Sequence, residues 1–309
     1  MKQCLLFFAL LLALGCSDGN KKLVERAPLI SQSYVDDTGR KVELPRAPRR
    51  VVSIAPNITE MIFAIGGAEK LAGRSQACDY PPEAAAIAAI TTFPQLDLEQ
   101  LKVSGGELII TTDEIFTPDD IARLEQLQMP IYLQSYRTLA DVNRCIRDLG
   151  TLLDREARAD ALADSLELIE QQVVAATENQ IKYRTMILVS TDPLKVVGGK
   201  GFLNELITKA GGMNVFASTA EDYPVMTPEA VLSAQPEYII IPSINEQIYA
   251  ELLLLYPILS NTPADLTKQV FRVNPDLFYR PGPRMIQGLL ELTHILHNQL
   301  TPQQFLDAD

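Results

Sequence analysis

The segment RVVSIAPNITEMIFAIGG at residues 50–67 sets the fold class of this chain. Residues 50–55 form a short, largely β-branched run that predicts a strand, and Pro56-Asn57 predicts a turn. Apolar residues then recur at helical spacing over residues 59–65, and the pair Gly66-Gly67 predicts the end of the helix. A strand that leads through a turn into a helix is the repeating unit of an α/β fold.

The same alternation of strands and helices continues on both sides of a long helical segment. Residues 34–45 read as a hairpin that turns at Asp37-Thr-Gly39. Strands alternating with helices predict parallel sheets. The first half has predicted strands at 108–111 and 130–133 and helices at 97–103 and 118–128, and the second half has strands at 185–190, 238–242 and 269–273 and helices at 202–210 and 283–298.

The middle of the chain predicts two consecutive helices. The first covers residues 139–152, and Asp154 is expected to cap a second that runs to about Gln180. Some 25 residues at 1.5 Å each make a rod of ~38 Å. We therefore predict an α/β protein with two α/β lobes, a single long helix that joins them, and a ligand cleft between the lobes. Because a continuous helix offers little backbone to absorb dihedral change, we expect modest lobe closure. The predicted parts are an N-terminal lobe at 34–153, a connecting helix at 154–181, a C-terminal lobe at 182–300 and a tail at 301–309.

The N-terminus has the pattern of an exported lipoprotein. Lys2 precedes an apolar run at residues 5–14 that is too short to span a bilayer as a helix but fits a signal peptide. Cys16 follows a small residue, which resembles the bacterial lipobox, so we expect residues 1–16 to be a signal peptide with Cys16 acylated. Residues 17–33 are polar and aperiodic, as in a flexible tether. This places the protein in the periplasm or cell envelope, anchored to a membrane by lipid.

Composition and charge exclude several classes of function. The formal net charge of −12 argues against nucleic acid as a partner. His294 and His297 are the only histidines and lie in the last predicted helix, so no metal site is expected. Cys78 and Cys145 are interpreted as separate thiols, although an exported protein could also pair them. The sequence has no nucleophile motif, and we predict that the protein has no catalytic residues and is not an enzyme.

The two halves share a short internal similarity. DLEQLKVSGGELII at 97–110 and TPEAVLSAQPEYII at 227–240 each begin with a capping residue and enter an apolar strand after a second glutamate. Glu99 and Glu229 therefore fall in the first turn of equivalent helices, one in each lobe. Glutamate at that position also complements the helix dipole, so either a binding or a structural role is open.

Five further segments resemble the cobalamin-binding periplasmic proteins, within the class III, helix-linked solute-binding proteins of ABC importers. They are RRVVSIAPNITE at 49–60, CDYPPEA at 78–84, TF at 92–93, YP at 223–224 and DLFYRPGPR at 276–284. The resemblance covers roughly residues 34–300.

The resemblance implies a corrinoid ligand, vitamin B12 or cobinamide, and no cofactor. It implies that Tyr80, Phe93 and Tyr223 contact the flat ring and that Asp276 and Arg280 bond its polar edge. It further implies that Glu99 and Glu229 dock on the two halves of the importer's permease dimer. The alternatives are a haem-binding or ferric-siderophore-binding protein of the same class and, from another class, an exported α/β enzyme.

Overall fold

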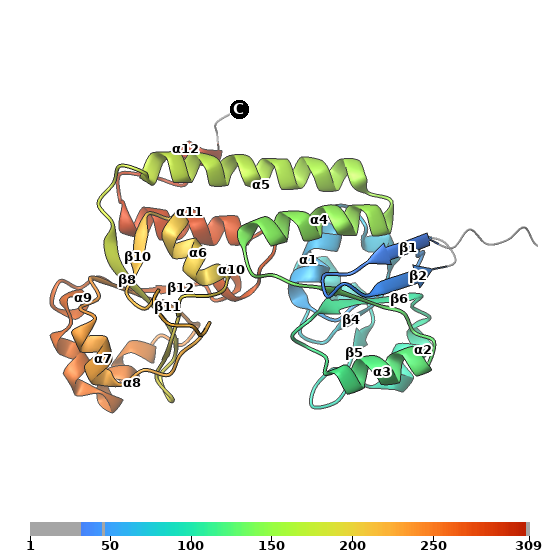
Figure 1. The fold of residues 1–309 in the computed structure, drawn as a ribbon, viewed down its shortest axis with the longest axis horizontal. Helices are drawn as coiled ribbons and strands as arrows, with labels where there is room; N and C mark the ends of the chain where they lie inside the picture. The colour runs from blue at the N-terminus through green and yellow to red at the C-terminus, as the bar shows by residue number, and fades with distance from the viewer. Residues whose placement is uncertain (1–31, 45–46, 307–309) are drawn as a thin grey trace, which may run out of the picture.

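The computed structural model describes residues 32–44 and 47–306. The predicted signal peptide, Cys16 and almost all of the predicted tether lie outside these residues. Two α/β lobes stand side by side and are bridged by α5 (Glu156–Thr177) (Figure 1), which confirms the predicted fold class. Within the described part of the chain, none of the helices combines the length and apolar character that a membrane span requires.

The N-terminal lobe is built on a five-stranded parallel sheet with strand order β5-β4-β3-β6-β7. An antiparallel hairpin of β1 (Gln32–Val35) and β2 (Lys41–Leu44) precedes the sheet, as predicted. The sheet strands are β3 (Val51–Ser53), β4 (Leu71–Ser75), β5 (Ala89–Ile90), β6 (Leu108–Thr112) and β7 (Ile131–Gln134). The helices of this lobe are α1 (Pro56–Ala64), η1 (Ala68–Lys70), η2 (Pro82–Ala86), α2 (Leu98–Ser104), α3 (Pro118–Gln126) and α4 (Leu139–Leu153).

The C-terminal lobe also contains a five-stranded sheet, but one of its strands is antiparallel. Its parallel strands have the order β10-β8-β11-β12, and β9 pairs with β8 in the antiparallel sense. The strands are β8 (Tyr183–Ser190), β9 (Lys195–Val196), β10 (Gly212–Asn214), β11 (Tyr238–Pro242) and β12 (Val270–Val273). The helices are α6 (Phe202–Lys209), α7 (Pro228–Ser233), α8 (Ile248–Leu255), η3 (Pro257–Asn261), α9 (Pro263–Leu266), α10 (Asp276–Tyr279), α11 (Met285–Leu296) and α12 (Gln303–Leu306). Helix α12 falls within the predicted tail and packs against α5.

The internal similarity corresponds to the same construction in both lobes. In the first, the carboxylate of Glu107 accepts from the backbone N–H of Arg49 at 2.8 Å. In the second, Glu237 accepts from the N–H of Arg184 at 2.8 Å. Arg50 and Arg184 also donate side-chain hydrogen bonds to the last carbonyls of α2 and α7. The two halves are therefore related in structure as well as in sequence.

Helices α4 and α5 lie antiparallel and tie the lobes together. One continuous cluster of buried apolar side chains runs from the first lobe through these helices into the second. At 1.5 Å per residue, the 22 residues of α5 span about 33 Å. Asp154 was predicted to cap α5, and this is wrong: it ends α4 in the left-handed conformation (φ 53°) and Arg155 takes the N-cap position of α5. Asp tolerates that conformation, and its carboxylate is engaged by Lys70 Nζ at 2.8 Å.

Gly150 of α4 lies in close contact with the first turn of α5. A Cβ at this position would lie 2.5 Å from Ala159 Cβ and 3.2 Å from Glu156 Cα. Gly150→Ala should therefore lower the free energy of unfolding by about 1–2 kcal/mol, because overpacking outweighs the better helix propensity of alanine. Urea unfolding measures this. The neighbouring exposed change Thr151→Ala serves as the control, and an unchanged or higher stability for Gly150→Ala would contradict the close approach.

Candidate functional site

A cavity of about 210 Å³ lies between the lobes, and both lobes contribute its walls. On the first lobe, the wall is formed by residues that follow β3, β6 and β7. On the second, it is formed by the segments that lead into α6 and α7 and by the turn between α10 and α11. Ligands in open α/β sheets bind outside the carboxyl ends of the strands, and the first-lobe wall has this position. The lining residues are Ala55, Pro56, Asn57, Thr112, Asp113, Glu114, Ile115, Tyr136, Arg137, Gly201, Phe202, Asp222, Tyr223, Tyr279 and Pro281.

Aromatic rings from both lobes line this cavity. Tyr136 is almost fully buried, whereas Tyr223 and Tyr279 remain 42% and 38% exposed and so present ring surface to a ligand. The Tyr279 hydroxyl donates to the carbonyl of Leu188 at 3.4 Å. Burial, and secondarily the neighbouring Tyr223, raises the pKa of Tyr279 to about 12. These phenols are therefore neutral hydrogen-bonding groups at physiological pH.

Four charged residues line the cavity and form what we call its floor: Arg137 and the carboxylates of Asp113, Glu114 and Asp222. Arg137 is bonded to Glu114 Oε1 at 2.7 Å and to Asp113 Oδ2 at 3.3 Å, both on its own lobe. Its guanidinium also lies 3.8 Å from Asp222 Oδ2, which belongs to the opposite lobe. The Arg137–Asp222 pair therefore crosses the cleft, and the Arg137 side chain remains 49% exposed.

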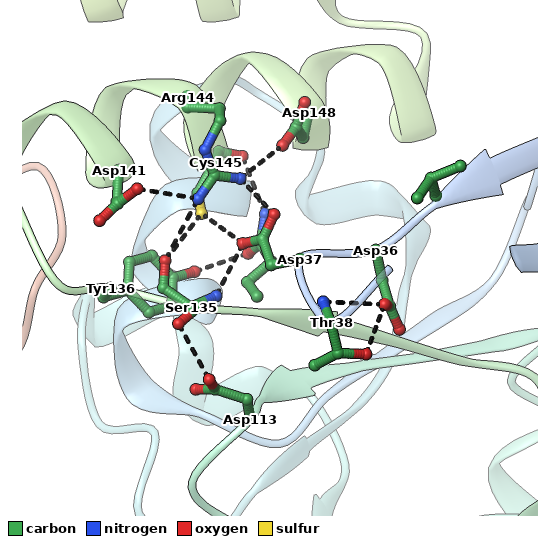
Figure 2. A network of polar contacts seen from close by, with 12 residues as sticks. Asp36, Asp37, Thr38, Asp113, Ser135, Tyr136, Asp141, Arg144, Cys145 and Asp148 are labelled. Atoms are coloured by element: carbon green, nitrogen blue, oxygen red, sulfur yellow. Dashed lines mark hydrogen bonds and ion pairs between the residues drawn. The ribbon is translucent and has the colours of Figure 1, made fainter. Parts of the chain in front are cut away.

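A polar network connects this floor to the N-terminal hairpin, as Figure 2 shows. Asp37, in the hairpin turn, accepts from the backbone N–H of Ser135 at 2.7 Å and pairs with Arg144 of α4. The Ser135 hydroxyl in turn donates to Asp113 Oδ2 at 2.9 Å. The network thus fixes the carboxylate that orients Arg137.

A second group of charges joins the lobes beside the cavity. Glu60 of α1 is buried, and both its oxygens accept from Arg284, from Nε and Nη2, each at 2.7 Å. Arg280 bonds Asp79 at 2.5 Å and lies 3.4 Å from Glu60. Asp276 lies 3.2 Å from Arg280 and 3.6 Å from Arg284. Because Glu60 and Asp79 belong to the first lobe and the other three residues to the second, these pairs hold the lobes together.

The ring of Tyr80 stacks on Arg284, one member of this group of charges. The guanidinium carbon of Arg284 lies 3.8 Å from the ring centroid of Tyr80, which is cation–π geometry. Tyr80 is nevertheless 41% exposed, so the ring retains surface that can contact another molecule.

The five residues predicted to bind ligand divide into three groups in the structure. Tyr223 lines the inter-lobe cavity. Tyr80, Asp276 and Arg280 belong to the charged group at the junction of the lobes, where Asp276 and Arg280 are paired with each other. Phe93 is 78% exposed, and the residues around it line a separate hollow on the first lobe. A ligand role for each of the five stays a prediction.

Sequence reasoning missed the charged floor of the cavity. Asp113 and Glu114 directly follow β6, and Arg137 comes three residues after the end of β7. The rule that ligand contacts follow the carboxyl ends of parallel strands would have pointed to these positions. Asp222 gave no comparable signal, because it lies in a loop and meets Arg137 only in the folded protein.

The two predicted docking glutamates are exposed and occupy equivalent places. Glu99 lies in the first turn of α2, whose N-cap Asp97 accepts from two backbone N–H groups. Glu229 lies in the first turn of α7, capped by Thr227. Both capping predictions are confirmed. Helices α2 and α7 lie on the side of the molecule opposite α5, one on each lobe (Figure 1).

The two thiols are separate and buried. Burial raises the pKa of Cys78 above its ordinary value and has the same effect on Cys145, whose Sγ donates to Asp37 at 3.5 Å. Both therefore remain protonated at neutral pH and are poor nucleophiles. His294 bonds the carbonyl of Leu300, and His297 is buried.

Two lobes joined by one long helix, with a cavity lined from both sides, are the architecture expected of a solute-binding protein. The family model described as periplasmic binding protein matches residues 51–277, and the chain belongs to this family. Among curated relatives, the vitamin B12-binding protein of Vibrio parahaemolyticus serotype O3:K6 is 28% identical over 246 residues, which cover 79% of this chain and 87% of that protein. The predicted resemblance to cobalamin-binding proteins is thereby confirmed.

Solved structures show the same architecture. The vitamin B12-binding protein BtuF of Vibrio cholerae is 25% identical with a TM-score of 0.71, over 81% of this chain and 97% of that one. The haem-binding protein RhuT of Roseiflexus sp. RS-1 is 24% identical with a TM-score of 0.73, over 82% of this chain and 99% of that one. The second likeness concerns the fold alone.

Proposed function

We propose that this protein is a lipid-anchored solute-binding protein that captures a corrinoid in the inter-lobe cleft and delivers it to an ABC importer. The observation that carries the proposal is the cavity between the lobes, which residues of both lobes line and to which the C-terminal lobe contributes the half-exposed tyrosines Tyr223 and Tyr279. Rigid rings suit a flat macrocycle, because they cover it at low entropic cost. The curated relatives named as vitamin B12-binding proteins support the choice of a corrinoid over haem or a ferric siderophore.

The cavity is smaller than the ~300–1,000 Å³ of most small-molecule sites. A corrinoid would therefore rest on the cavity and extend outward between the lobes. Tyr80, with an exposed ring at the junction of the lobes, is placed to contact the part of the ligand that lies beyond the cavity floor. Phe93 would take part only if the ligand reached the outer loops of the first lobe.

The chemistry of the cleft favours binding over catalysis. Its charged groups are carboxylates and an arginine that are already paired with each other, and the described residues that line the cavity include no cysteine, serine or histidine. The buried thiols Cys78 and Cys145 lie outside that lining and are protonated. We therefore propose that the protein is not an enzyme and that it holds its ligand unchanged in the periplasm or cell envelope, anchored through Cys16.

Calorimetric titration of the full-length protein in detergent tests the ligand. Cyanocobalamin and cobinamide should each bind with one site per chain. Tyr223→Ala should weaken binding about tenfold, because it removes a half-exposed ring from the cavity wall, whereas Tyr223→Phe should retain most of the affinity. Tight binding of haem or of a ferric siderophore, with no heat from either corrinoid, would overturn the choice of ligand and leave the fold assignment intact.

A further inference from the structure

We propose that the cleft selects ligands whose edge carries neutral amides and rejects those whose edge carries carboxylates, and that the pairing of Arg137 sets this selection. The inference rests on the proposed function and deepens it, since it names the charge class of the ligand. It follows from the state of the three arginines at the cleft, each of which is already engaged by carboxylates of the protein.

Arg137 is the only cation among the described residues that line the cavity. Asp113 and Glu114 hold its guanidinium from one side, and Asp222 faces it from the other lobe. The two hydrogen bonds from Glu114 and Asp113 leave donors of Arg137 open, but a ligand carboxylate that reached them would lie beside all three protein carboxylates, which repel it.

The two arginines beside the cavity, Arg280 and Arg284, are also paired with carboxylates of the protein. Arg284 forms a bidentate hydrogen-bonded pair with the buried Glu60. Arg280 pairs with Asp79, Asp276 and Glu60. Breaking either arrangement would also loosen the junction of the lobes. Neither arginine is therefore a free anion site.

Counted together, the carboxylates around the cleft outnumber the cations. Six carboxylates surround three guanidinium groups, which leaves a negative field where the ligand binds. A carboxylate-bearing ligand would be repelled by that field. Amide N–H groups gain from it, because a paired carboxylate still has lone pairs that accept hydrogen bonds. The carboxylates are Glu60, Asp79, Asp113, Glu114, Asp222 and Asp276, and the cations are Arg137, Arg280 and Arg284.

Two corrinoids with the same ring and axial cyanides but different edges test the inference. Dicyanocobinamide carries amides, whereas dicyanocobyrinic acid carries free carboxylates at the same positions. The full-length wild-type protein should bind dicyanocobinamide at least about a hundredfold more tightly than dicyanocobyrinic acid, as measured by competition at low ionic strength. The ratio of the two affinities should fall as added salt screens the negative field. The double variant Glu114→Gln/Asp222→Asn leaves Asp113 as the one charged partner of Arg137. It should lower the ratio of the two affinities about tenfold, because it removes two of the negative charges that repel a ligand carboxylate.

The control is Glu43→Gln/Glu178→Gln, which removes the same charge from exposed positions on β2 and at the end of α5. It should keep the wild-type ratio. Equal binding of both corrinoids to the wild-type protein would overturn the inference and leave the proposed function standing. The same conclusion would follow if neither Glu114→Gln/Asp222→Asn nor Glu114→Gln changed the ratio of the two corrinoid affinities. Binding of neither corrinoid would overturn the proposed function itself. Thermal unfolding of each variant verifies that it is folded.

Discussion

Corrinoid uptake is expected to fall to background in cells that depend on this protein when Glu99→Arg and Glu229→Arg are combined. Each change reverses the charge at the exposed tip of one lobe, in the first turns of α2 and α7. A twofold permease would present the same basic surface to both lobes, so two repulsive contacts replace two attractive ones. Uptake of radiolabelled cyanocobalamin, in a strain with this chain as its sole binding protein, measures the effect. Each single variant should retain partial uptake.

Binding and delivery must be separated in that experiment. The purified double variant should bind corrinoid with wild-type affinity, because neither residue lines the cavity. Glu43→Arg/Glu178→Arg makes the same change in net charge at exposed positions elsewhere and should support normal uptake. Wild-type uptake by Glu99→Arg/Glu229→Arg would show that these glutamates have only the helix-dipole role.

Arg284→Leu is expected to lower the free energy of unfolding by about 3 kcal/mol, the lower end of the cost of breaking a buried ion pair, because Arg280 still lies 3.4 Å from Glu60. Glu60 has a side chain that is only 3% exposed, and Arg284 supplies both of its short hydrogen bonds. The change also removes the guanidinium that stacks on Tyr80. Because Glu60 and Arg284 belong to different lobes, corrinoid affinity should fall as well. Urea unfolding and calorimetric titration measure the two effects.

A second variant distinguishes the buried charge from the lost side-chain volume. Glu60→Leu/Arg284→Leu removes both charges and should recover most of the lost stability, since apolar pairs often replace buried ion pairs without cost. Arg272→Leu, which breaks an exposed pair at 3.7 Å with Glu246, should change stability little. If the double variant were as unstable as Arg284→Leu, lost packing, and not the loss of the main partner of Glu60, would explain the lower stability.

The fold was predictable because local signals agreed with the global plan. Apolar spacing and capping residues predict the local structure of three segments. These are the strand-turn-helix at residues 50–67 and the repeated segments at 97–110 and 227–240. Two of the strands that escaped prediction lack a clear apolar period. Strand β4 includes Gly73 and Arg74, and β5 has only two residues, so neither shows a period that the sequence could reveal.

The site was less predictable, because its main interactions join distant parts of the chain. Tyr223 was found through an aromatic-proline pair in a predicted loop. Two ion pairs bring together side chains from different lobes: Arg137 with Asp222, and Glu60 with Arg284. Nothing in the local sequence indicates which arginine will meet which carboxylate. Arg280 was expected to donate hydrogen bonds to a ligand, but in the structure it is paired with Asp79 and Asp276.

The internal correspondence of the lobes has a consequence for how the protein meets a twofold partner. Glu107 and Glu237 brace their lobes through matching hydrogen bonds, so the helices that carry Glu99 and Glu229 are held alike. A partner with its own rotational axis would then accept the loaded protein in either of two orientations, half a turn apart. Two indistinguishable poses double the productive encounters and are worth about 0.4 kcal/mol of statistical advantage. The ligand, bound between unlike walls, would arrive facing either way, so the translocation path would have to tolerate both of its faces.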